Sequence, residues 1–317
     1  MKIAKSLILT LFCLTLSALC CAEDIDPQKI IEKVIAKYKS LETYKAEGTV
    51  VMEITEMTID GTKVEGMKMD KTFSIKLKKP NFYLISWVDD HGMSSGGVWN
   101  AGNQPYIYMG PGKVYSKIKG DAMALSAATG ISGGVASVIP QLFLEASGDF
   151  NVFSGLTETK LEKAESIEGE ECYVISGKST VSEKETFWIS KSRDLIIKYS
   201  YSITPAGYTE PEMTDEDLEK TMVAMGMEIT EESKKKITAE IKKDKEWREQ
   251  LKTANMKGVS TELHLNITTP ELTQTDFEFS LPQGAILEEF LFEMRDDTPD
   301  SVSTSESGMI KKEMNAR

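Results

Sequence analysis

The sequence has few cysteines in positions where they could pair. Four of its 317 residues are cysteine, and Cys13, Cys20 and Cys21 all lie within the first 21 positions. Cys172 is the single cysteine of the remainder, so no intramolecular disulfide can form there. The fold must therefore be held by its hydrophobic core, and we expect Cys172 to be a small buried side chain of that core rather than a nucleophile.

Long hydrophobic runs are missing after the first 22 residues. Lys2 and Lys5 precede an apolar run over 7–19, and small residues follow it, which is typical of a secretory signal peptide over 1–22. The run is shorter than the roughly 20 apolar residues that span a membrane. We therefore expect an exported protein with no stable transmembrane segment after cleavage, periplasmic in a bacterium with an outer membrane and secreted otherwise.

Lipidation at the end of the signal peptide is an alternative. Cys20 or Cys21 could carry the lipid, but a small residue normally precedes a lipidated cysteine. Bulky Leu19 precedes Cys20, and Cys20 itself precedes Cys21. The pattern favours cleavage without lipidation and leaves the choice open.

Positive charge is scarce. Without Lys2 and Lys5 the chain has 35 basic residues against 50 acidic ones, a net charge of about −15. Binding to phosphate backbones requires a basic surface, so nucleic acid is excluded as a partner. Disorder of the whole chain is also excluded, because 40% of the residues are hydrophobic and 27% charged, an ordinary globular composition.

The region after the signal peptide begins with a helix pattern and changes to a strand pattern. Asp26-Pro27 offers an N-cap and a first-turn proline, and apolar residues follow at helical spacing to Leu41. From Ala46 the apolar period becomes two, which predicts antiparallel strands. Further strands are expected at 72–78, 82–88, 97–100, 106–109, 113–118, 157–166, 171–176, 185–190, 195–203, 260–268 and 276–281.

Three segments depart from this strand pattern. Residues 121–146 are rich in Ala, Ser and Gly and predict one or two helices, interrupted near 130–134, that cover a sheet. Residues 205–257 are rich in Glu, Lys and Met and predict two charged helices inserted into a β domain. Residues 296–317 are polar and predict a disordered tail. The expectation is one domain over 23–295.

A serine hydrolase site is a minor possibility. Gly92-Met93-Ser94-Ser95-Gly96 has the spelling of a nucleophile elbow, with His91 beside it. An elbow needs a strand before it and a helix after it, whereas another strand pattern follows at Gly97. A hairpin loop is the favoured interpretation.

Metal or cofactor chemistry has little support in the sequence. Only two histidines occur, His91 in an expected loop and His264 on the polar side of an alternating strand, where we expect it to face solvent. The acidic doublets lack the spacing of a calcium loop and suit solvated turns and helix starts. We expect no cofactor, no metal and no enzymatic activity.

The order of elements resembles a known family, the periplasmic lipoprotein carriers of the LolA/LolB type. The stretches that carry the resemblance are Lys79-Pro80-Asn81-Phe82, Trp99 through Tyr106-Ile107-Tyr108, Phe187-Trp188-Ile189 and the close Phe277-Glu278-Phe279-Ser280-Leu281-Pro282. Lys79 stands where the carriers favour arginine, and the compact carriers lack the insertion at 205–257.

This resemblance implies an α+β fold, an incomplete antiparallel β-barrel whose concave face is covered by helices. It also implies an apolar cavity that accepts acyl chains of a lipid or lipoprotein, whose burial stabilises by about 0.8 kcal/mol per CH₂. Each candidate residue lies on the apolar side of an expected strand and would equally suit a filled core. The candidates are Phe73, Ile75, Tyr199, Tyr201, Leu263, Leu265, Phe277 and Phe279.

Two functions from different classes follow. The first is an exported carrier of lipid or lipoprotein acyl chains, in which 121–146 forms a lid hinged at Gly130, Gly133 and Gly134. The alternative is a non-enzymatic envelope module that binds a protein partner through 214–252. The sequence leaves open the ligand, the oligomeric state and whether the barrel is hollow.

Overall fold

The computed structural model describes most of the chain after the signal-peptide region. The predicted signal peptide at 1–22, the tail at 296–317, and His91 and Ser94 all lie outside the described residues. The described ranges are 25–59, 62–64, 66–89, 95–135, 137–144, 152–179, 182–204, 214–224, 228–239, 241–242 and 256–288.

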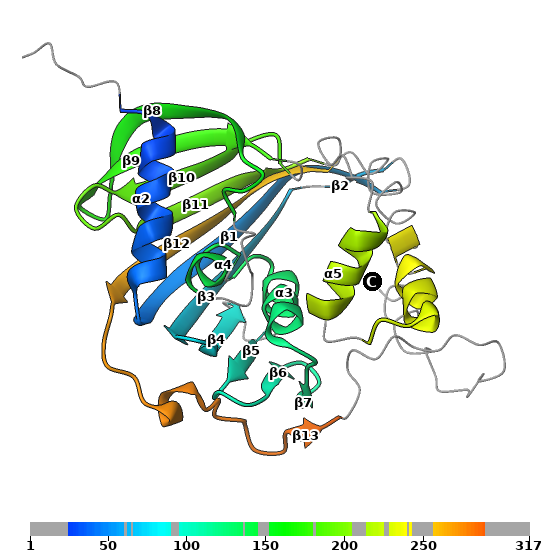
Figure 1. Cartoon of the computed structure of the whole chain (residues 1–317). Coiled ribbons are helices and arrows are strands. Elements are labelled where there is room, and N and C mark those ends of the chain that lie inside the picture. Colours follow the sequence, from blue (N-terminus) through cyan, green and yellow to red (C-terminus); the bar gives the residue numbers. More distant parts are fainter. Residues whose placement is uncertain are drawn as a thin grey trace, which may run out of the picture.

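One strongly curved sheet organises the described residues (Figure 1). Its 13 strands run in the order β13-β7-β6-β5-β4-β3-β1-β12-β11-β10-β9-β8, with β2 paired to β1. Neighbours are antiparallel except for β13 and β7. The strands are β1 (Thr43–Ile59), β2 (Thr62–Val64), β3 (Met67–Lys78), β4 (Phe82–Asp89), β5 (Gly96–Asn100), β6 (Pro105–Met109), β7 (Val114–Lys117), β8 (Thr157–Ile167), β9 (Glu170–Lys178), β10 (Glu185–Ser190), β11 (Ile196–Ile203), β12 (Lys257–Thr268) and β13 (Ile286–Leu287).

The sheet does not close on itself, because β13 and β8 remain at opposite ends of the strand order. Helices α2 (Pro27–Ser40), α3 (Asp121–Ser132) and α4 (Ile139–Phe143) all lie on its concave face (Figure 1). The predicted fold class, an incomplete antiparallel barrel with helices over the concave face, is confirmed. The interruption predicted near 130–134 is also present, between α3 and α4.

Helix α2 forms as its sequence predicts. The Asp26 carboxylate accepts a hydrogen bond from the backbone N–H of Gln28, and Pro27 lies in the first turn. The apolar stripe of α2 is buried against the sheet. Tyr38, near the end of the helix, belongs to this buried stripe, and its hydroxyl oxygen accepts a hydrogen bond from the backbone N–H of Ile196.

Strands β11 and β12 flank the insertion and pair directly with each other. Within the insertion, α5 (Asp215–Ala224) and a helix over 231–239 share a small cluster of Leu218, Met222 and Ile237. Helix α5 contacts α3 at the side of the concave face (Figure 1). The two expected helices are therefore present, and Met222 packs in an ordinary apolar cluster.

The segment after β12 crosses the convex face of the sheet. Instead of the strand expected at 276–281, it forms a short 3-10 helix, η3 (Gln274–Phe277), closed by a capping box between Thr273 and Asp276. Phe277 is buried against Phe82, and Phe279 stacks on Trp99. The alternation at 276–281 therefore arises from two aromatic anchors and not from strand pairing.

Candidate functional site

The concave face of the sheet is apolar and carries a helical cover. The cover comprises residues 121–135 and 137–144, which include α3, α4 and their connection. Side chains of the sheet beneath it, among them Val50, Ile75 and Ile85, are buried in one core with the cover. The cover and the concave face therefore share one apolar core.

Helix α3 meets the sheet mainly through small side chains, and Leu125 is the large residue among its buried ones. Its buried residues are Ala124, Leu125, Ala128 and Ser132. Each alanine methyl group contributes only about 0.8 kcal/mol on burial. Separation of α3 from the sheet therefore costs much less than separation of a leucine-rich helix of the same length would.

The N-terminal end of α3 is anchored firmly. The Asp121 carboxylate accepts hydrogen bonds from the Tyr83 hydroxyl at 2.9 Å and from Asn100 Nδ2 at 2.8 Å. Burial raises the pKa of Tyr83, so its hydroxyl stays protonated as a donor. A carboxylate at this position also interacts favourably with the helix dipole.

Two of the glycines expected to form a hinge, Gly133 and Gly134, follow the C-terminal end of α3. Gly133 has φ 77° and Gly134 has φ 125°, conformations that residues with a Cβ rarely adopt. Lys71 of β3 holds this end by donating to the carbonyl of Ser132 at 2.6 Å and to that of Ile131 at 3.4 Å. Burial lowers the pKa of Lys71. Helix α3 is thus held by hydrogen bonds at both ends, and the two glycines connect it to the rest of the cover.

Methionines border the hinge on the concave side. Met52 of β1 lies opposite Met69 of β3, and Met67 follows on the same face. Met67 is 42% exposed and Met69 is 37% exposed. A Cβ at position 133 would lie 3.7 Å from Met52 Cε. These flexible, polarizable side chains adapt to apolar partners of varied shape, so this edge of the cover offers an apolar entrance.

A buried polar network joins the cover to β12. The Ser137 hydroxyl of the cover donates to Glu262 Oε2 at 2.7 Å, and Glu262 Oε1 lies 3.0 Å from His264 Nε2. The second pair is close enough for an ion pair, although its geometry falls outside that of a hydrogen bond. His264 Nδ1 lies 3.2 Å from the Tyr44 hydroxyl. We call these four residues the latch.

The latch corrects the predicted orientation of β12. His264 was expected to face solvent, but it is 1% exposed and Glu262 is 3% exposed. The register places His264 opposite Gly48 on the concave face, and the Phe73 ring occupies the space that a side chain at position 48 would take. Leu263 and Leu265 therefore point to the convex face, so their predicted apolar interior position is wrong.

The predicted cavity residues separate into two groups. Phe73, Ile75 and Tyr199 are buried in the core on the concave face, and Tyr201 packs partly buried against it. Phe73 stacks edge-on against His264. The convex group comprises Leu263, Leu265, Phe277 and Phe279.

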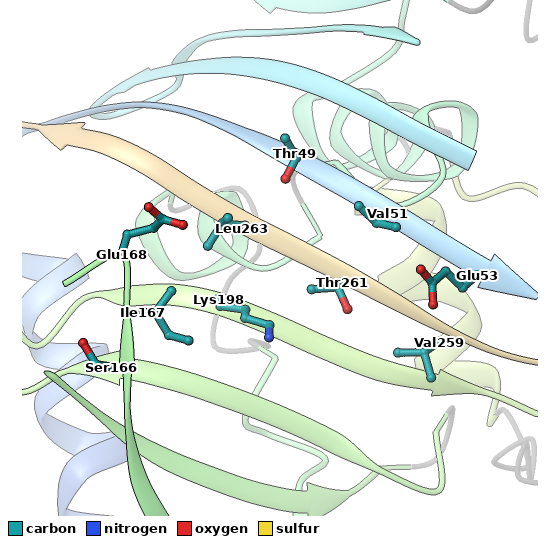
Figure 2. Close-up of a pocket in the computed structure, with 10 residues that line it drawn as sticks. All are labelled: Thr49, Val51, Glu53, Ser166, Ile167, Glu168, Lys198, Val259, Thr261 and Leu263. Carbon is teal, nitrogen blue, oxygen red and sulfur yellow. The ribbon is translucent and has the colours of Figure 1, made fainter. Parts of the chain in front are cut away.

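Two grooves lie on the convex face, and the sequence patterns gave no indication of them. The first has a volume of about 470 Å³ and lies between β1, β12, β11 and the turn between β8 and β9 (Figure 2). The second has a volume of about 700 Å³ and continues along β1 towards Phe279 and Pro282. The sequence feature that could have indicated these grooves is the apolar character of Leu263 and Leu265, but the alternation pattern assigns these residues to the wrong face.

Ser94 lies outside the described residues, and the strands on either side of it do not fit the elbow pattern. Strands β4 and β5, which flank the Gly92–Gly96 stretch, pair with each other as antiparallel neighbours. Strand follows strand there, whereas a nucleophile elbow places a helix after the strand. Cys172 is fully buried, as predicted, and burial raises the pKa of its thiol.

The described residues contain neither a metal cluster nor a spanning helix. No group of three or more His, Cys, Asp and Glu side chains is placed to hold a metal ion in this part of the chain. Nor does any helix within the described ranges have both the length and the hydropathy needed to cross a membrane.

Comparison with known proteins gives distant structural similarity only. No family model and no curated protein sequence matches the chain. An uncharacterized conserved protein from Thermus thermophilus is 7% identical, with a TM-score of 0.40 over 83% of this chain and 98% of its own. The Mycobacterium tuberculosis lipoprotein LppX is 12% identical, with a TM-score of 0.36 over 78% of this chain and 99% of its own.

A LolA superfamily protein from Nitrosomonas europaea is also similar, at 11% identity and a TM-score of 0.29, over 80% of this chain and 98% of its own. MucB, solved in complex with periplasmic MucA, is 10% identical with a TM-score of 0.29, over 56% of this chain and 49% of its own. The chain is thus similar to solved structures that include a LolA superfamily protein, whereas its function must be inferred from its own residues.

Proposed function

We propose that the protein is a non-enzymatic carrier that binds an acyl chain of a lipid or lipoprotein between the cover and the concave face of the sheet. The observation that carries the proposal is the hinged attachment of α3. Ala124, Ala128 and a single buried leucine, Leu125, hold α3 on an apolar surface, and Gly133 and Gly134 would allow its C-terminal end to move. An acyl chain inserted there would contact the concave face of the sheet in place of the cover.

The acyl chain enters at the methionine edge. Met67 and Met69 leave apolar surface exposed next to the hinge, and each CH₂ that is buried there contributes about 0.8 kcal/mol. No catalytic group is needed for this binding. Export through the predicted signal peptide would place the carrier in the cell envelope.

The first test is native mass spectrometry of the protein purified from its host, followed by lipid extraction. A lipid or acylated peptide bound at defined stoichiometry supports the proposal. A ligand-free mass, together with failure to take up a fluorescent fatty acid, argues against it.

The second test distinguishes the two faces of the sheet. Met69→Glu places a carboxylate at the proposed entrance and should weaken fatty-acid uptake about tenfold or more, because a charge is poorly tolerated beside an apolar ligand. Thr72→Glu is the matched control, since Thr72 is exposed on the convex face of the same strand. Equal effects of the two variants would refute binding on the concave face.

A second candidate is an envelope interaction module that binds a protein partner through the insertion. It is favoured by the contact of α5 with α3, which places the insertion beside the cover. Deletion of 214–252 tests it. Loss of partner binding with fatty-acid uptake retained would favour this candidate.

A further inference from the structure

The two convex grooves form one continuous channel along a pair of strands. Both include Thr49 of β1. On β12, Leu265 lies in the second groove and Leu263 in the first, and these residues are two positions apart on the same face. We call the combined channel the convex groove. Its β1 residues are Glu47, Thr49, Val51 and Glu53, and its β12 residues are Val259, Thr261, Leu263 and Leu265.

Two segments from elsewhere in the chain form the walls of the convex groove. The end of β8 contributes Ser166 and Ile167 and the turn after it contributes Glu168, and this part of the chain passes over the sheet in Figure 2. Irregular register between Glu162 and Glu165 bends β8, and the Glu165 carboxylate accepts a hydrogen bond from Trp188 Nε1 at 2.7 Å. The other wall is the segment with Phe279 and Pro282.

The floor of the convex groove leaves apolar side chains in contact with water. Val259 is 43% exposed, while Val51, Leu263 and Leu265 are partly exposed. Threonines lie between them on the same floor. A ligand that covers this floor would bury branched apolar groups and also meet hydroxyl groups at regular spacing.

Negative charge predominates along the convex groove. Glu47 and Glu53 lie at the two ends of its β1 side, and Glu168 lies on the turn that forms one wall; all three are exposed. Lys198 is the basic residue that lines the convex groove, and its Nζ lies 4.1 Å from the centre of the Trp188 ring. The carboxylates disfavour anionic lipid headgroups and favour a ligand with positive charges.

The ligand cannot add a strand to the floor of the convex groove. Strand β1 is already paired on both sides, with β3 and β12, and β12 is paired with β1 and β11. Recognition must therefore use side chains and the shape of the channel. Glu53 lies six positions after Glu47, which corresponds to about 20 Å of extended chain.

We propose that the convex groove binds an extended polypeptide segment of a partner protein, about seven residues long, with small apolar side chains between basic residues at its ends. The basic ends pair with Glu47 and Glu53. The apolar side chains cover Val51, Thr261 and Leu263. This site is on the opposite face of the sheet from the proposed acyl site and does not depend on it.

The test uses isothermal titration calorimetry of the full exported chain at low ionic strength. The probe is the peptide Lys-Val-Thr-Val-Thr-Val-Lys, and the charge-reversed control is Glu-Val-Thr-Val-Thr-Val-Glu. We expect the basic peptide to bind, its affinity to fall with added salt, and the acidic peptide not to bind. Absence of binding by the basic peptide, or equal binding by both, overturns the proposal.

Three variants locate the binding. Glu47→Gln with Glu53→Gln should weaken the basic peptide about five- to tenfold, because an exposed ion pair changes an equilibrium by up to about fivefold. Thr261→Arg should abolish binding by filling the floor and adding a like charge. Glu32→Gln on α2 is the matched control and should have no effect, since Glu32 is exposed on a helix over the concave face.

Two further outcomes would assign the convex groove to other occupants and overturn the proposal. The first is a dimer in sedimentation that Thr261→Arg dissociates, which would mean that a second copy of the chain occupies the groove. The second is displacement of the peptide by fluorescent fatty acid together with loss of fatty-acid uptake in Thr261→Arg. If Thr261→Arg leaves fatty-acid uptake intact, the acyl site and the convex groove are separate sites.

Discussion

The latch allows a quantitative prediction about how the cover is held. In the variant Glu262→Leu, Ser137 loses its 2.7 Å acceptor and His264 loses the carboxylate 3.0 Å from Nε2. His264 is buried and Ser137 is partly buried, and an unsatisfied buried polar group costs about 1–3 kcal/mol. We expect the free energy of unfolding to fall by about 3–5 kcal/mol. His264→Leu leaves the Glu262 carboxylate buried without the imidazole nitrogen that lies 3.0 Å from it, so we expect a fall of similar size.

The double variant of Glu262 and His264 measures the coupling energy between the two residues. With Leu at both positions, neither a lone carboxylate nor a lone imidazole remains, so the loss should be smaller than the sum of the two single losses by about 2 kcal/mol. The assay is urea unfolding followed by circular dichroism and tryptophan fluorescence. Ser126→Leu, on the exposed side of α3, controls for added apolar surface. Additive effects, or single losses under about 1 kcal/mol, would refute the coupling within the latch.

Three further predictions concern stability. Burial raises the pKa of Glu185 despite the hydrogen bond from Tyr199 at 2.9 Å, so folding favours the protonated carboxyl and stability falls as the pH rises through the raised pKa. Glu185→Gln should therefore stabilise the fold by about 1 kcal/mol at neutral pH, and unfolding curves across pH should show this gain disappearing below the ordinary pKa of glutamate. Gly134→Ala should destabilise the fold by about 1–2 kcal/mol because residue 134 has a φ of 125°, whereas Gly130→Ala, within α3 and with open space at the Cβ, should be neutral or stabilising by up to about 1 kcal/mol. Equal effects of the two variants in thermal unfolding would contradict the special backbone conformation assigned to the hinge at Gly134. Phe277→Ala should cost about 3–5 kcal/mol in urea unfolding, since the side chain is fully buried, and a loss below about 1 kcal/mol would mean that the segment across the convex face is not anchored there.

Periodicity was sufficient to predict the sheet. The change of apolar period near Ala46 and the short connections after it led to an antiparallel meander, which β1 and β3 to β7 form. The interrupted helical cover followed from the glycines at 130–134 within an apolar, alanine-rich stretch. Both patterns are local in the chain, so the sequence contains them directly.

The facing of β12 could not be predicted in the same way. An alternating strand has two faces, and its pattern does not say which face meets the core when the buried side chains are polar. Glu262 and His264 are buried because Ser137 and Tyr44, distant in sequence, satisfy them. The orientation depends on tertiary partners that become visible only in the fold.

The convex groove was missed for a related reason. Its walls come from the β8–β9 turn and from the segment with Phe279, which are far apart in the chain. The Phe-x-Phe pattern at Phe277 and Phe279 suggested a strand, because alternation of aromatic residues is the ordinary signature of one. Here the two rings anchor an irregular segment on the convex face instead.

The most direct test of the account is to lock the cover onto the sheet. A Cβ at position 134 would lie 3.5 Å from Ser260 Oγ, which is close to the separation that a disulfide spans, so Gly134→Cys with Ser260→Cys should form one on oxidation. Cys172 is buried and does not compete. The same protein after reduction is the matched control. We predict that the oxidised form fails to take up fluorescent fatty acid and that reduction restores uptake. Equal uptake by both forms would contradict binding beneath the cover.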